Sequence, residues 1–131
     1  MGVRWFATST TSDTTLVTTA ETVVATLAGV STNQPGQSIS FEGSVTLTTG
    51  GSTTGATLRI RRDSLTGTVI GEAVQDAVEA AAGSVETHQI DHTVTDEGEF
   101  SGRTYVLTVA QVAAAANGTA TQAHLNAAVS P

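Results

Sequence analysis

Three of the five basic residues in this 131-residue chain lie close together, at Arg59, Arg61 and Arg62. Clustered arginines can bind phosphate groups, or they can pair with the carboxylates of another protein. Nucleic-acid binding needs many lysines and arginines to neutralise phosphates, whereas this chain has no lysine and a formal net charge of −7. We therefore expect no nucleic-acid partner, and we expect the three arginines to donate salt bridges to a neighbouring protein or subunit.

The sequence lacks the residue patterns of common catalytic centres. Gly50 to Gly55 has the G-x-x-x-x-G spacing of a phosphate-binding loop, but Ala56 stands where that loop requires lysine. No G-x-S-x-G motif marks a hydrolase nucleophile, and the absence of cysteine removes disulfides and thiolate metal sites. The sequence leaves open a carboxylate pair for glycoside hydrolysis, although few aromatic residues are present to hold a sugar. We expect no enzymatic activity, no catalytic residues and no cofactor.

Two histidines are placed where a metal ion could be considered. His88 and His92 would share one face of a helix, but their segment alternates as a strand, on which four residues span about 13 Å. That separation is too large for two ligands of one zinc ion. We interpret both histidines as lying at the edge of a core or at an interface. At a subunit contact they would make assembly sensitive to mild acid.

A group of carboxylates surrounds Gly98, with Asp96, Glu97 and Glu99 on one short turn. Three carboxylates could hold calcium, but their spacing differs from that of an EF-hand loop. The simpler interpretation is a solvated hairpin turn. No metal-binding residues are therefore assigned.

The elements that position these residues are predicted to be strands. Threonine supplies roughly a fifth of the chain, and β-branched side chains favour the half-buried surface of a sheet. Residues 37–49 alternate most clearly between apolar and polar side chains, with the apolar ones at Ile39, Phe41, Val45 and Leu47. Further strands are expected at 21–30, 56–61, 68–71, 84–94, 103–111 and 119–129. Arg59 and Arg61 then face outward from a strand whose Leu58 and Ile60 face inward.

Residues 72–83 fit two structures equally well. Val74, Ala77, Val78 and Ala81 have helical spacing, and Gly83 could end a helix, but Val74 and Val78 also share one face of a strand. The remaining strands and their turns, about ten residues apart, predict an all-β fold. We expect an antiparallel β-sandwich of jelly-roll or immunoglobulin-like kind, because no helices alternate with the strands.

We divide the chain into an extended N-terminal arm, residues 1–20, and a single β-sandwich domain, residues 21–131. Residues 8–19 are nearly all hydroxyl-bearing, so alone they would form a mobile segment. Trp5 and Phe6 precede them, and these two aromatics either dock on another molecule or pack back onto their own domain. We count both among the interface candidates. No apolar stretch resembles a secretion signal or spans a bilayer, so we expect no membrane partner.

From Glu21 onward, the order of features resembles that of capsid decoration (cement) proteins of tailed bacteriophages and of related head-fibre and minor virion proteins. The segments that carry the resemblance are "TTAETVVATLAGVST", "VTLTTGGSTTGATLRIRRDSLTGTVIGE", "GRTYVLTVAQ" and "NGTATQAHLNAAV". The resemblance implies a jelly-roll-like sandwich that forms a homo-oligomer, commonly a trimer. It also implies that residues 72–83 are strand and loop.

The same resemblance implies a non-enzymatic viral structural protein that binds the major capsid protein and stabilises the capsid. It would be made in the host cytoplasm without a signal peptide and would be located on the exterior of the virion. The arm with Trp5 and Phe6 would reach a neighbouring capsid subunit. The alternative interpretation is a small ligand-binding or adhesive β-sandwich module, which binds carbohydrate with or without calcium, such as a head-fibre or tail-associated protein.

Overall fold

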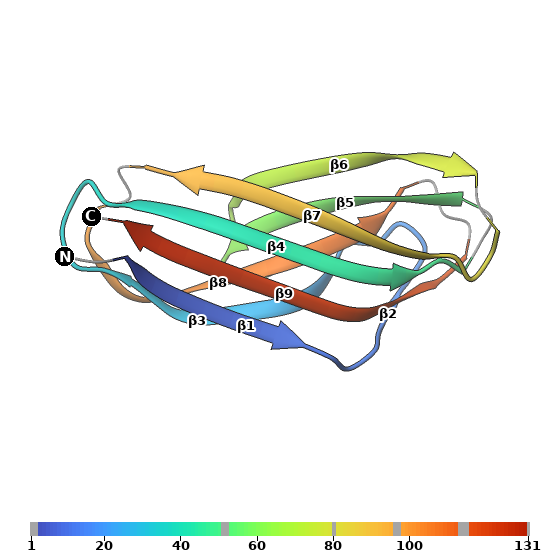
Figure 1. Cartoon of the computed structure of the whole chain (residues 1–131), viewed down its shortest axis with the longest axis horizontal. Coiled ribbons are helices and arrows are strands. Elements are labelled where there is room, and N and C mark those ends of the chain that lie inside the picture. Colours follow the sequence, from blue (N-terminus) through green and yellow to red (C-terminus); the bar gives the residue numbers. More distant parts are fainter. Residues whose placement is uncertain (1–2, 51–52, 80, 96–97, 113–115, 131) are drawn as a thin grey trace.

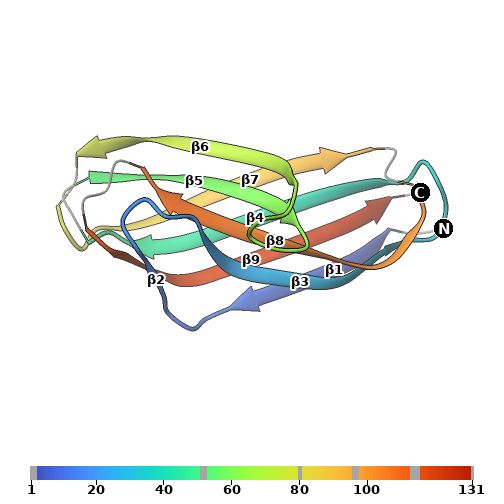
Figure 2. The same ribbon diagram turned by 180° about the vertical axis from the view of Figure 1, so that it is seen from behind.

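The computed structural model describes residues 3–50, 53–79, 81–95, 98–112 and 116–130, which form strands and connecting turns. The strands run along the long axis of the molecule in two layers, seen from the front in Figure 1 and from behind in Figure 2. Their bounds are β1 Arg4–Thr10, β2 Thr14–Leu16, β3 Thr22–Thr32, β4 Ser38–Thr48, β5 Thr53–Arg62, β6 Val69–Glu79, β7 Val85–Val94, β8 Phe100–Gln111 and β9 Gly118–Ser130. No helix in these ranges is long and apolar enough to cross a membrane.

The strands form two antiparallel sheets that face each other. The first sheet has the order β1-β9-β4-β7, with β2 also pairing with β9, and the second has the order β3-β8-β5-β6. β1 and β2 pair with successive parts of β9, so together they occupy one edge position. When they are counted as one interrupted strand, the strand order is that of a jelly roll. The predicted all-β antiparallel sandwich of jelly-roll kind is therefore confirmed.

The N-terminal segment is extended, as expected, but it belongs to the first sheet. Residues 4–10 and 14–16 pair with β9, and the side chain of Leu16 is fully buried. The side-chain amide of Gln111 donates hydrogen bonds to the backbone oxygens of Leu16 and Thr18, at 3.3 and 2.9 Å. Backbone pairing along a free strand edge thus compensates for the few apolar residues of this segment. These residues do not form an arm apart from the domain.

Strand β4 carries the alternation that the sequence predicted. Its buried side chains face the second sheet, and they are Ile39, Phe41, Val45 and Leu47. The ring of Phe41 packs against that of Tyr105 from β8, with ring centres 4.7 Å apart. Gly43 occupies the remaining inward position, where an added Cβ would lie 3.0 Å from Ile90 Cγ2 and 3.2 Å from Leu107 Cδ1. Large neighbours therefore fill the space that a side chain on Gly43 would need.

The segment with two alternatives is a strand as far as Glu79, and residues 81–83 lie outside that strand. Residues 69–79 form β6, which pairs with β5 at the edge of the second sheet. Leu58 pairs with Ala73, and Thr57 with Val74. The apolar spacing of this segment fits a helix and a strand equally well. Its backbone pairing with β5 selects the strand.

Candidate functional site

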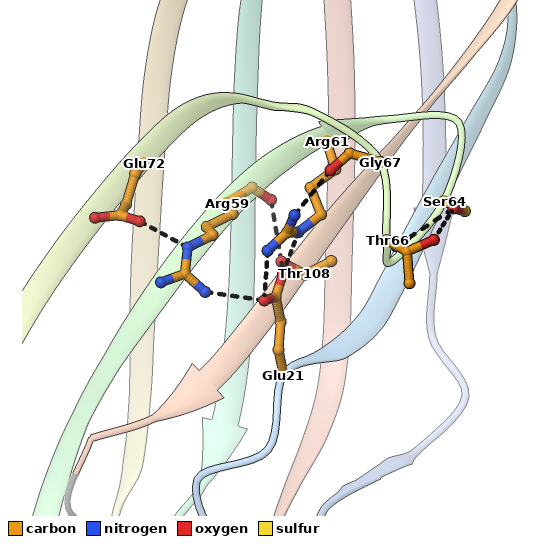
Figure 3. Close-up of polar contacts among 8 residues, drawn as sticks. All are labelled: Glu21, Arg59, Arg61, Ser64, Thr66, Gly67, Glu72 and Thr108. Carbon is orange, nitrogen blue, oxygen red and sulfur yellow. Dashed lines mark hydrogen bonds and ion pairs between the residues drawn. The ribbon is translucent and has the colours of Figure 1, made fainter.

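The predicted arginine cluster lies on the outer face of the second sheet, where it forms an ion-pair network within the chain (Figure 3). Arg61 donates from Nε and Nη2 to the two carboxylate oxygens of Glu21, at 2.6 and 2.8 Å. Arg59 Nη1 donates to Glu21 Oε1 at 2.9 Å, and the hydroxyl of Thr108 donates to Glu21 Oε2 at 2.6 Å. Glu21 thus accepts four hydrogen bonds from two neighbouring strands.

Three elements bring these groups together. Glu21 stands just before β3, Arg59 and Arg61 point outward from β5, and Thr108 lies on β8 between those two strands. The side chain of Glu21 is 17% exposed, and Thr108 is fully buried beneath the network. Hydrogen bonds from Arg61, helped by Thr108 and by the two positive charges and opposed by partial burial, lower the pKa of Glu21 to about 2. The carboxylate therefore stays ionised throughout the neutral and mildly acidic range.

Arg59 and Arg61 also bind groups on or near β6. Arg59 Nε donates to Glu72 Oε2 at 2.6 Å, and Arg61 Nη1 donates to the backbone oxygen of Gly67 at 2.8 Å. The hydrogen bond to Glu72 raises the pKa of Arg59 further above its ordinary value. Both guanidinium groups are thus engaged with carboxylates of their own chain. Sequence patterns gave no sign of this, because the partners are distant in sequence.

Arg62 ends β5, and the chain then turns toward β6. The backbone N–H of Arg62 donates to the oxygen of Thr68 at 2.9 Å, and Asp63 follows with a φ of 72°. The strand predicted at 56–61 is therefore confirmed, and a turn joins it to the next strand.

Exposed valines flank the network on the same face. Strand register places Val69 opposite Arg61, Glu72 opposite Arg59, and Val74 opposite Thr57. The exposed fractions of Val69 and Val74 are 40% and 57%. We call this surface the arginine face, and its residues are Arg59, Arg61, Val69, Glu72 and Val74.

The two N-terminal aromatics separate from each other. Phe6 faces inward and packs against the core, so it follows the expectation of packing back onto its own domain. Trp5 points the other way from β1 and is 73% exposed. It lies on the outer face of the first sheet, on the side of the sandwich opposite the arginine face. The interface role predicted for Trp5 remains a prediction.

The histidines His88 and His92 lie inside their own sandwich, at the edge of its core. His88 is 4% exposed, and its Nε2 lies 3.0 Å from Glu86 Oε1. A Cβ on Gly71 of β6 would lie 2.8 Å from the ring of His92, so β6 and β7 approach closely there. This is one of the two expected locations, and it gives no support for an acid-sensitive subunit contact at these residues.

The described residues contain no group of three or more histidines and carboxylates that could hold a metal ion. The sequence made the carboxylate turn around Gly98 a candidate for calcium binding, but Asp96 and Glu97 of this turn lie outside the described residues. Thr32 Oγ1 donates to the backbone oxygen of Gly98 at 2.7 Å.

Comparison with known proteins places the fold. No family model matches the chain, and no curated protein matches its sequence. A solved structure of the infectious bursal disease virus VP2 subviral particle matches with a TM-score of 0.63 and 10% identity, over 96% of this chain and 32% of that chain. A structure of the T13 particle of that virus matches with a TM-score of 0.64 and 9% identity, over 95% of this chain and 31% of that chain. A structure of the Gx strain of the virus matches with a TM-score of 0.58 and 12% identity, over 98% of this chain and 32% of that chain.

The chain thus spans about a third of the length of those viral chains. At this level of identity the match establishes a shared fold, which is the β-sandwich described above.

Proposed function

We propose that this chain is a non-enzymatic virion protein that binds the outer surface of a tailed-bacteriophage capsid and stabilises it. Support comes from the jelly-roll fold, which it shares with chains of a viral particle, and from the order of sequence features. A decoration protein acts through many copies, each of which adds one contact to a repeating lattice. A small rigid sandwich with two broad outer faces suits that task.

The arginine face is the observation that carries the proposal. Protein interfaces are enriched in arginine and depleted in acidic residues at their core. Here two arginines are neutralised locally by two carboxylates, so covering the face would bury no unpaired charge. Val69 and Val74 supply apolar area beside the network. Because Glu21 already holds both guanidinium groups in place, little side-chain entropy would be lost on docking.

Docking through the arginine face would turn the second sheet toward the capsid. The first sheet, with Trp5, would then face away from the particle, because the outer faces of a sandwich point in opposite directions (Figures 1 and 2). This orientation replaces the capsid contact that the resemblance implies for Trp5. We propose the major capsid protein as the partner. Arg59 would reach it through the exposed 29% of its side chain.

Sedimentation with capsids tests this function. Particles assembled from the major capsid protein of the same genome are incubated with the purified chain, and the bound copies are counted in the pellet. We expect saturable binding, and Val74→Asp weakens it at least about tenfold by placing a charge in the interface. Val85→Asp is the matched control, because Val85 is 68% exposed on the first sheet. Absence of binding by the wild-type chain would refute the function, and equal binding by the two variants would refute the face.

We also propose that the chain forms a homotrimer. Light scattering on the purified protein should then give a mass of about 40 kDa, three times the 13.2 kDa of one chain. A mass of one chain at micromolar concentration would contradict this part of the proposal without affecting the capsid contact.

A further inference from the structure

The outer face of the first sheet is hollowed beside its exposed tryptophan. One hollow, of about 250 Å³, is lined by side chains that include Trp5, Ser40, Asp91 and Ala128. A second, of about 370 Å³, adjoins it and is lined by Ala7, Ser9 and His124 among others. Glu42 and Asn126 line both hollows. Because they share these two residues, the hollows form one shallow groove, and each hollow alone has a size near the lower end for small-molecule sites.

The strand register explains why the groove lies there. One row across the sheet pairs Trp5 with Ala128, and then Ala128 with Ser40. The small side chains of Ala128 and Ser40 leave room next to the large indole. This is the tryptophan groove, and the residues that define it are Trp5, Ser40, Glu42, Asp91, Asn126 and Ala128.

The next row carries the polar groups. Asn126 pairs with Glu42, and Glu42 pairs with Asp91 on the neighbouring strand. Like charges directly opposite each other on a sheet destabilise it. Among the described residues, the ring nitrogen Nε2 of His124 lies 3.5 Å from Glu42 Oε1. Asp91 has no side-chain ion pair within the described part of the chain. The row therefore presents two carboxylates as hydrogen-bond acceptors at the groove floor.

The donor and acceptor set selects the chemical class of ligand. Carboxylates repel phosphates and other anions, and they accept strong hydrogen bonds from hydroxyl groups. The amide of Asn126 both donates and accepts, and the hydroxyl of Ser40 does the same. The indole of Trp5 offers an apolar face that needs no hydrogen-bond partner on its flat side. A neutral sugar combines these needs, since its ring has one face of C–H groups and a rim of hydroxyls.

We infer that the tryptophan groove binds a neutral carbohydrate. The sugar ring stacks on Trp5, and its hydroxyls donate to Glu42 and Asp91 while Asn126 bridges between ring oxygens and hydroxyls. Because the groove is shallow and Glu42 is 63% exposed, the affinity expected for a short oligosaccharide is about 0.1–1 mM. The site goes beyond the proposed capsid contact and does not depend on it, because it lies on the opposite face.

Intrinsic fluorescence provides the test, since Trp5 is the one tryptophan in the chain. The full purified chain is screened on an array of neutral and anionic oligosaccharides, and the members that bind are titrated while tryptophan emission is followed. We expect binding of neutral members with a shift of the emission to shorter wavelength. Anionic members should bind at least about tenfold more weakly.

Substitutions locate the binding to the groove. Trp5→Ala should weaken binding at least about tenfold, Trp5→Phe should restore part of it, and Glu42→Gln should weaken it several-fold. Because Trp5 is so exposed, these variants should melt close to the wild type. Val85→Ala on the same sheet is the control and should bind normally. Binding of Trp5→Ala is followed by calorimetry, since that variant has lost the fluorescent group.

Three outcomes would overturn the inference. One is that no neutral member of the array binds at millimolar concentration, and another is that binding is unchanged in Trp5→Ala. The third is that the groove binds a lysine-rich peptide and no sugar, which would assign the carboxylates to a protein partner. Capsid sedimentation is read separately, so loss of sugar binding with normal capsid binding would refute the groove alone.

Discussion

Arg61 forms a bidentate ion pair with Glu21, which lies 40 residues earlier in the sequence. Its Nε and Nη2 donate to the two carboxylate oxygens at 2.6 and 2.8 Å. This contact ties the start of β3 to β5 over the strand β8 that lies between them. Together with the ion pair between Arg59 and Glu72, it balances the charges of two arginines with those of two carboxylates.

Removing the negative charge of Glu21 should destabilise the fold. Glu21→Gln leaves Arg59 and Arg61 without a shared carboxylate, and the loss expected in the free energy of unfolding is on the order of 2–3 kcal/mol. Denaturant unfolding at pH 7 measures it. Glu99→Gln makes the same chemical change at an exposed position and should alter stability by less than about 0.5 kcal/mol. Equal effects of the two changes would contradict the structural role of the network.

The contribution of Glu21 should disappear in acid. Because its pKa is lowered from 4.5 to about 2 in the folded chain, the unfolded chain takes up the proton first as the pH falls. The stabilisation is therefore complete above about pH 4.5 and is lost as the pH falls toward 2. The difference in unfolding free energy between wild type and Glu21→Gln should shrink over that interval. A difference that stays constant from pH 7 to pH 2 would argue against an ionised Glu21 as its source.

Adding one methyl group at Gly43 should overpack the core. The new Cβ of Gly43→Ala would lie 3.0 Å from Ile90 and 3.2 Å from Leu107, so the loss expected in unfolding free energy is about 1–3 kcal/mol. Ser40→Ala on the outer face of the same strand should change it by less than about 0.5 kcal/mol. If Gly43→Ala were as stable as Ser40→Ala, β4 would not pack as described.

The amide of Gln111 should hold the N-terminal strand in place. Its Nε2 donates to Leu16 O and Thr18 O, and also to Ala116 O at 3.2 Å. Gln111→Ala should speed hydrogen exchange in residues 14–18 and lower the free energy of unfolding by about 1–3 kcal/mol. Gln122→Ala, an exposed position on β9, should leave that exchange unchanged. Protection of β2 that survives Gln111→Ala would show that backbone pairing alone holds it.

The sequence predicted the strands wherever one face is apolar and the other polar. Residues 38–48 are the clearest case, since Ile39, Phe41, Val45 and Leu47 are all buried. Two regions could not be settled in this way. Residues 4–16 have too few apolar side chains for periodicity to reveal a strand. They are held in the sheet by backbone pairing with the edge of β9. Residues 72–79 fit a helix and a strand alike until β5 is available as a partner.

The candidate surfaces were harder to predict than the strands. The outward direction of Arg59 and Arg61 followed from the alternation of β5, but their pairing with Glu21 depends on the sheet order β3-β8-β5. The tryptophan groove likewise depends on which strands are neighbours, since Trp5, Glu42 and Asp91 come from three different strands. Local periodicity does not determine which strands are neighbours in a sheet, so neither surface could be predicted from the sequence.

A density map of the assembled particle tests the central proposal most directly. Capsids are incubated with the purified chain and imaged by electron cryomicroscopy, and the sandwich is fitted into any added density. The proposal predicts density on the outer surface, with the arginine face against the shell and the tryptophan groove turned away from it. Capsids whose outer surface gains no density, or a sandwich that contacts the shell through the tryptophan groove, would contradict it.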